Sequence, residues 1–132
     1  MKIVKTEEIF LVTSNEVGKM AQIAGIIAQK DINIRTICAY VRDNQAIFRI
    51  ITSDNSKAKE ALSQQYSNVE LKEAVLVELS DKIGELYKLG EKLKEEGIDL
   101  EYIYGTTSSS QEAALIFSSD DNEKAIKILS NL

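Results

Sequence analysis

The sequence contains two similar segments 66 positions apart, and this internal repeat restricts the fold more than any other feature. Residues 15–20, NEVGKM, align without a gap with residues 81–86, DKIGEL. On the same alignment, residues 32–34 fall on residues 98–100. A lone domain of about 60 residues is only marginally stable. We therefore expect two repeats, 1–73 and 74–132, that share a core or an interface.

Each repeat predicts the same order of elements. β-Branched and aromatic residues predict a strand at residues 9–13 and again at 75–79. Apolar residues spaced three and four apart then predict a helix in each repeat. The later elements are a strand at 32–42, a turn at Asp43-Asn44, a strand at 46–52 and a helix near 58–62 in the first repeat; their counterparts are 98–106, 107–110, 113–117 and 125–129.

A fourth strand is expected in the first repeat only. Residues 69–73 have strand-like composition, whereas the second repeat runs out of sequence at Leu132. The order strand–helix–strand–strand–helix–strand is the ferredoxin-like arrangement, an α+β fold of antiparallel sheets with helices on one face. We expect a partner chain or the other repeat to cover the open sheet edge of the second repeat.

Composition argues against nucleic-acid and membrane binding. The chain has 16 Lys and Arg against 21 Asp and Glu, a net charge of −5, and no basic cluster to displace counterions from phosphates. RNA-recognition modules share the strand order but display aromatic residues on their third strand, where residues 46–50 offer only Phe48, so RNA binding is a distant alternative. The first ten residues lack an apolar signal segment, and no apolar stretch is long enough to span a bilayer. We expect a cytoplasmic protein.

The residue inventory also argues against catalysis. Without histidine and with a single cysteine, Cys38, the chain has no residues for a zinc site, a histidine-based triad or an internal disulfide. Acylphosphatases share the strand order but need an arginine in the first loop, and residues 14–19 and 80–85 contain none. We therefore expect no enzymatic activity, no metal and no cofactor, with Cys38 acting as a small buried hydrophobe in mid-strand.

The turn-and-helix segments resemble the ACT family. In that family an Asp/Asn-x-Pro-Gly turn opens a helix of the form Leu-Ala-x-Ile, followed by Gly-Ile-Asn-Ile; Val17 and Ile83 stand where the family has proline. The matching segments are residues 15–23 with 31–34, and residues 81–86 with 97–100. Residues 100–104 and 122–125 also resemble stand-alone tandem ACT proteins. The resemblance implies a regulatory protein that binds an amino acid, forms a homodimer and acts in trans on a metabolic enzyme or regulator.

The resemblance places the ligand between the first turn of one unit and the second strand of a neighbouring unit. A helix N-terminus offers unpaired N–H groups to a carboxylate, and glycine leaves that backbone accessible. Asn15 and Asp81 are expected to cap these helices, with Asn33 and Asp99 near the same end of the sheet. The candidate ligand-binding residues are Asn15, Val17, Gly18, Lys19, Met20, Asn33, Asp81, Ile83, Gly84, Glu85, Leu86 and Asp99.

Two interpretations remain open at this stage. In the first, a ligand stabilises one arrangement of the units, and a partner recognises that arrangement. In the second, the repeats dimerise or dock on an enzyme without any ligand, and each candidate residue is a cap or a turn residue only. Lys19 and Glu85 occupy equivalent positions with opposite charge. We therefore expect at most one repeat to bind a ligand.

Overall fold

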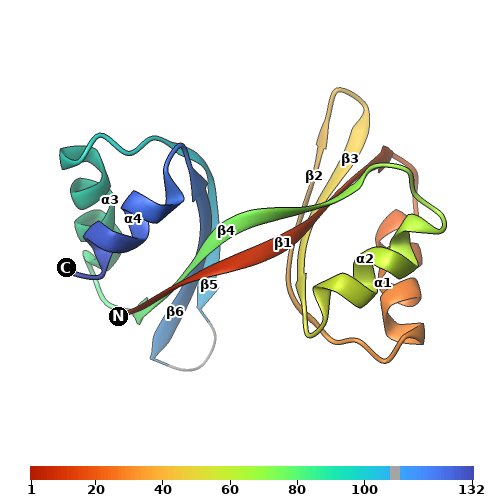
Figure 1. The fold of residues 1–132 in the computed structure, drawn as a ribbon, viewed down its shortest axis with the longest axis horizontal. Helices are drawn as coiled ribbons and strands as arrows, with labels where there is room; N and C mark the ends of the chain where they lie inside the picture. Colours follow the sequence, from red (N-terminus) through yellow and green to blue (C-terminus); the bar gives the residue numbers. More distant parts are fainter. Residues whose placement is uncertain (108–110) are drawn as a thin grey trace. The chain divides into compact units, whose positions relative to one another are not determined.

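The computed structural model describes residues 1–107 and 111–132 and shows an α+β fold of two βαββαβ units (Figure 1). The described strands are β1 (Lys2–Ser14), β2 (Ile34–Arg42), β3 (Gln45–Thr52), β4 (Val69–Ser80), β5 (Leu100–Thr107) and β6 (Glu112–Ser119). The described helices are α1 (Lys19–Gln29), α2 (Asn55–Ser63), α3 (Glu85–Glu95) and α4 (Asn122–Leu129). The strand order is β2-β3-β1-β4-β6-β5. The expected fold class is confirmed.

Two strands are shared between the compact units. The first unit is Glu7–Lys72, and the second unit is Met1–Thr6 together with Glu73–Leu132. Consequently β1 gives residues 2–6 to the second unit and residues 7–14 to the first, while β4 is divided between residues 72 and 73. The boundaries 1–73 and 74–132 remain a prediction about the repeats. The compact units are defined by which residues pack together, and this division does not show where each sequence repeat begins.

The start of β1 takes the place for which the second repeat has no strand of its own. Ile3 packs against the second unit's core, and the Lys5 ammonium lies 3.1 Å from the Glu73 carboxylate. Each unit therefore takes its fourth strand from the strand that opens the other repeat. Residues 69–73 and 75–79, expected as separate strands, form the single strand β4.

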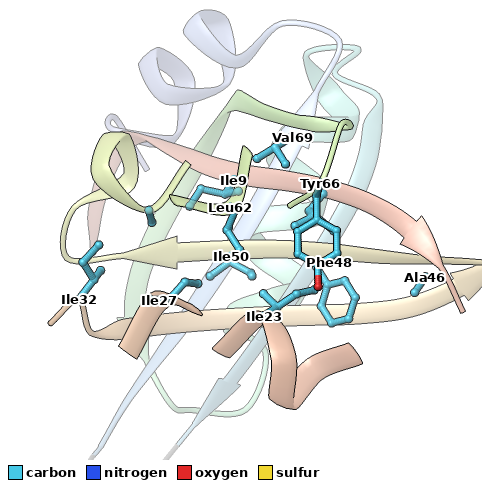
Figure 2. Close-up of a cluster of buried hydrophobic side chains, with 12 residues drawn as sticks. Ile9, Ile23, Ile27, Ile32, Ala46, Phe48, Ile50, Leu62, Tyr66 and Val69 are labelled. Atoms are coloured by element: carbon cyan, nitrogen blue, oxygen red, sulfur yellow. The ribbon is translucent and has the colours of Figure 1, made fainter. Parts of the chain in front are cut away.

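Each unit has its own hydrophobic core beneath two helices. In the first unit, Ile23 and Ile27 of α1 are buried against Phe48 and Ile50 of β3 (Figure 2). Their spacing of four residues places both isoleucines on one helix face. The second unit repeats the pattern around Phe117, with Leu89 and Leu93 from α3 and Leu129 from α4. None of the described helices is long and apolar enough to cross a membrane.

The β2–β3 hairpin has the turn that the sequence predicts. Asp43 and Asn44 have φ values of 52° and 64°, and Arg42 pairs with Gln45. Two central residues with positive φ define a type I′ turn, whose twist matches that of the flanking strands. The expected second hairpin turn at 107–110 falls largely on residues 108–110, which lie outside the described residues.

Candidate functional site

A tight turn joins β1 to α1. The Lys19 N–H donates a hydrogen bond to the Glu16 carbonyl at 3.3 Å, which closes a four-residue turn. Gly18, the third residue of that turn, has φ 90° and ψ 0°. These angles belong to the third position of a type II turn and favour glycine, because a Cβ would be strained there.

The turn that joins β4 to α3 has the same geometry. The Glu85 N–H donates to the Lys82 carbonyl at 3.3 Å, and Gly84 has φ 89° and ψ −5°. Val17 and Ile83 occupy the second position of these turns, where proline is common because its φ is already set. The two turns therefore have the proline-type geometry without proline.

The helices that follow these turns begin without a side-chain cap. Asp54 caps α2 and Asp121 caps α4, each accepting a backbone N–H bond, at 3.1 and 3.0 Å respectively. Among the described residues, no side chain caps α1 or α3. The expectation that Asn15 and Asp81 cap these helices is wrong, because the turn separates each of them from its helix. Apart from the Lys19 and Glu85 N–H groups, which close the turns, the N–H groups of the first helical turn and the positive end of each helix dipole are available to an anion.

A hollow lies beside each turn, with a volume of about 260 Å³ in the first unit and about 250 Å³ in the second. Each is bounded by the turn, the start of the helix, the end of the second strand and the start of the third strand of the same unit. The first hollow is lined by Asn15, Glu16, Gly18, Lys19, Met20, Ala39, Tyr40, Val41, Ala46 and Phe48. The second is lined by Leu79, Ser80, Asp81, Lys82, Glu85, Leu86, Gly105, Thr106, Thr107, Ala113 and Leu115.

Most of the candidate residues at the turns line these hollows. The structure brings together four of them in the first unit and three in the second, namely Asn15, Gly18, Lys19 and Met20, and Asp81, Glu85 and Leu86. Val17 and Ile83 lie outside the linings, fully exposed at the tips of the turns. Gly84 shapes its turn without lining the second hollow.

Asn33 and Asp99 lie at the opposite end of the strands from the hollows. The Asn33 N–H donates to the Ser53 hydroxyl at 3.0 Å, and the Ser53 N–H donates to the Asn33 carbonyl at 2.9 Å. Asp99 makes the equivalent pair of bonds with Asp120 at 3.1 and 3.0 Å. Because β2 has nine residues, about 30 Å of strand separates its two ends. The expectation that Asn33 and Asp99 lie near the same end of the sheet as Asn15 and Asp81 is wrong.

The ends of β2 and β5 are the part of the site that the sequence did not reveal. The resemblance pointed to the second strand of a neighbouring unit, whereas Ala39, Tyr40 and Val41 line the hollow of their own unit. A usable signal was present in the two-residue turn at Asp43-Asn44. That turn holds the end of β2 beside the start of β3, at the point where β1 ends.

The first hollow has an ammonium group at its edge. The Lys19 Nζ lies 5.5 Å from the centroid of the Tyr66 ring, a cation–π geometry. Tyr66 is buried in the same core cluster as Phe48, and the two rings lie next to each other (Figure 2). Burial raises the pKa of Tyr66, and the nearby Glu16 carboxylate raises it further. Tyr66 is therefore neutral at physiological pH.

The second hollow has carboxylates at the corresponding positions. Glu85 stands where the first unit has Lys19, and the Lys88 ammonium lies 3.1 Å from it. Asp81 stands where the first unit has Asn15, and it accepts a bond from the Thr107 hydroxyl at 3.1 Å. The two hollows differ in charge, because Glu16 and Lys19 line the first, whereas Asp81, Lys82 and Glu85 line the second.

Replacing Tyr66 by phenylalanine is expected to stabilise the protein by about 1 kcal/mol. Among the described residues, the Tyr66 hydroxyl is the one buried side-chain polar group without a hydrogen-bond partner. An unpaired buried hydroxyl costs free energy, and phenylalanine keeps the ring and removes that cost. Urea unfolding of the Tyr66→Phe variant measures the difference. A loss of stability would mean that the hydroxyl has a partner in solution.

Cys38 lies at the middle of β2 and is half-buried and unpaired with any other cysteine. Burial raises the pKa of its thiol above the ordinary value, and the nearby Arg49 guanidinium offsets part of that rise. The thiolate, which is the reactive form, is therefore scarce in the folded protein.

Within residues 1–107 and 111–132, no group of three or more metal-ligating side chains is placed to hold a metal ion.

Two βαββαβ units, each with a glycine turn ahead of an uncapped helix, define a tandem-repeat protein of the ferredoxin-like class. The chain belongs to the ACT domain pair family, which matches residues 3–132. The expected family is confirmed. No functionally curated protein matches the sequence.

Several solved structures share the fold. Protein BT0572 from Bacteroides thetaiotaomicron has a TM-score of 0.90 at 23% identity, covering 98% of this chain and 89% of that protein. The ligand-free regulatory subunit of aspartate kinase from Thermus thermophilus has a TM-score of 0.68 at 15% identity, with 98% and 95% covered. E. coli aspartokinase III in complex with lysine and aspartate has a TM-score of 0.61 at 19% identity, with 98% and 32% covered. At these identities the likeness concerns the fold.

Proposed function

We propose that this chain binds a free amino acid in the hollow of its first unit and regulates a metabolic enzyme or regulator in trans. The observation that carries the proposal is the contrast between its helices. Asp54 and Asp121 cap α2 and α4, whereas α1 and α3 begin at glycine turns with a hollow beside them, and no side chain in the described part of the chain caps either helix. A carboxylate satisfies such N–H groups well, and its charge suits the positive end of the dipole.

The first hollow suits the carboxylate of an amino acid better than the second. Gly18 leaves the backbone approachable, since among the described residues no heavy atom beyond Gly18 and its two chain neighbours lies within 4 Å of the place where a Cβ would stand. Lys19 adds a positive charge, and the side-chain oxygen of Asn15 and the Glu16 carboxylate offer acceptors to an ammonium group. Met20, Val41 and Phe48 form an apolar wall for a side chain.

The family and the solved structures support amino acids as the ligand class. The chain is an ACT domain pair, and the similar E. coli aspartokinase III was solved with lysine and aspartate. In our proposal the bound ligand favours one conformation of the units, and a separate partner binds that conformation preferentially. The effect on the partner is limited to the difference in ligand affinity between the two conformations.

A thermal-melt panel against the twenty amino acids tests the proposal. A ligand at 100 times its Kd adds about 2.7 kcal/mol, which raises the melting temperature of a protein of this size by several degrees. Calorimetry on the ligand that shifts the melt should then give one site per chain. A panel with no shift for any amino acid would contradict the proposal and favour the interpretation of a ligand-free docking module.

Met20→Glu is expected to weaken amino-acid binding at least tenfold, whereas Leu86→Glu should leave it unchanged. Met20 and Leu86 are equivalent residues in the first turn of α1 and α3, 60% and 58% exposed, and each lines its hollow. A carboxylate there repels the ligand carboxylate but favours the helix, because it lies at the positive end of the dipole. Loss of binding in Leu86→Glu alone would assign the site to the second unit.

A further inference from the structure

The Tyr66 hydroxyl is a buried donor that has no acceptor within the described part of the chain. Tyr66 is 8% exposed, and its hydroxyl makes no hydrogen bond. The Lys19 ammonium lies over the face of the ring, 5.5 Å from the centroid, whereas the hydroxyl lies in the plane of the ring. An unpaired buried hydroxyl costs stability, so its presence calls for a role that offsets this cost.

Three of the residues that line the first hollow lie around Tyr66. The Phe48 ring is next to the Tyr66 ring, and the Lys19 ammonium lies over it. Burial raises the pKa of Tyr66 and the Glu16 carboxylate raises it further, which places that carboxylate near the hydroxyl. Figure 2 shows the hydroxyl pointing toward Phe48 of β3 and Ile23 of α1. The hydroxyl therefore lies beneath the start of α1, with Phe48 shared between its surroundings and the hollow.

The charges near the hydroxyl favour a neutral partner. Lys19 and Glu16 both line the first hollow, so a charged ligand side chain of either sign is attracted by one of them and repelled by the other. An alcohol or amide oxygen is neutral and accepts a hydrogen bond from a tyrosine hydroxyl. Met20 and Phe48 offer apolar surface to the carbon atoms that precede such an oxygen. A short apolar stem that ends in a neutral oxygen therefore suits the hollow and Tyr66 together.

We propose that the amino acid bound in the first hollow has a neutral side chain ending in an alcohol or amide oxygen, which accepts a hydrogen bond from the Tyr66 hydroxyl. This inference rests on the proposed function and names its ligand class. Because the hydroxyl is buried, the Phe48 ring turns aside to let the ligand side chain reach it, a rotamer change in one side chain. Tyr66 then lowers the stability of the protein but selects the ligand, a common trade between stability and function.

Calorimetry with pairs of amino acids of similar size tests the proposal. Serine, threonine, asparagine and glutamine are compared with alanine, valine, leucine and methionine respectively. For at least one pair, the wild-type chain is expected to bind the oxygen-containing member more tightly by about tenfold or more, because only that member satisfies the Tyr66 hydroxyl. In Tyr66→Phe the preference should disappear or reverse, because the ligand oxygen then has no donor, while the affinity for the apolar member should be unchanged.

Tyr87→Phe is the matched control, since it removes a hydroxyl from a tyrosine of the second unit that is 70% exposed, and it should leave the preference unchanged. Thermal melts of both variants show that they are folded. Tightest binding by an apolar or a charged amino acid, or a preference that Tyr66→Phe leaves unchanged, would overturn this inference and leave the proposed function intact. Absence of binding by all twenty amino acids would overturn both.

Discussion

Replacing Arg49 by isoleucine is expected to lower the free energy of unfolding by about 3–5 kcal/mol. The Glu8 side chain is fully buried, and the Arg49 Nη1 lies 3.7 Å from its Oε1. Arg49 is itself mostly buried, donates to the Tyr40 hydroxyl at 3.3 Å and lies 4.7 Å from the centroid of Phe10. Removing the arginine takes a cation away from a carboxylate that water does not reach.

The sister repeat provides the matched control for this prediction. Its residues at the positions of Glu8 and Arg49 are Ala74 and Ile116, both buried, and Leu76 pairs with Ile116 just as Phe10 pairs with Arg49. The double variant Glu8→Ala with Arg49→Ile should therefore recover most of the lost stability, because an apolar pair often replaces a buried ion pair at little cost.

Urea unfolding of the wild type, the two single variants and the double variant gives a double-mutant cycle. The expected coupling energy between the two positions is at least about 1 kcal/mol, since the effects of substitutions on stability do not add when the two residues are in direct contact. A loss below about 1 kcal/mol in Arg49→Ile alone would contradict the argument that the buried carboxylate depends on this arginine.

Replacing Phe117 by alanine is expected to cost about 3–5 kcal/mol and to destabilise both units. Phe117 is completely buried in the second unit's core, where alanine leaves a cavity among Leu89, Leu93 and Leu129. The effect should extend to the first unit because β1 and β4 run through both units. When either unit unfolds, β1 and β4 are disrupted, and the other unit then loses part of its own sheet.

Cys38 reports this coupling from the first unit. Its thiol is half-buried with a raised pKa, so alkylation of the folded protein is slow and accelerates when the first unit opens. A loss of about 3 kcal/mol multiplies the open population on the order of 100-fold. The alkylation rate of Phe117→Ala should therefore rise steeply, while Tyr87→Ala, a change at an exposed residue of the second unit, should match the wild type. Unchanged labelling in Phe117→Ala would show that the units unfold separately.

The repeat, the order of elements and the ferredoxin-like fold were readable from local patterns. The spacing of Ile23 and Ile27 predicted α1, and Asp43-Asn44 predicted the hairpin turn that the structure contains. Gly18 and Gly84 were singled out as residues that leave the backbone accessible to a ligand, and the structure adds a conformational role. They form the third position of type II turns that keep Asn15 and Asp81 away from the helix N-termini.

The sequence by itself determined the elements of this protein, because side-chain periodicity and turn composition act over a few residues. Tertiary structure alone decided which strand completes each unit. Residues 2–6 lie in the second unit, and no local pattern encodes that choice, since strand pairing depends on partners distant in the chain. The same reason explains the site. Asn33 lies a full strand away from the turn of its own unit, while Ala39 and Val41 lie beside that turn, because the direction and register of β2 place them there.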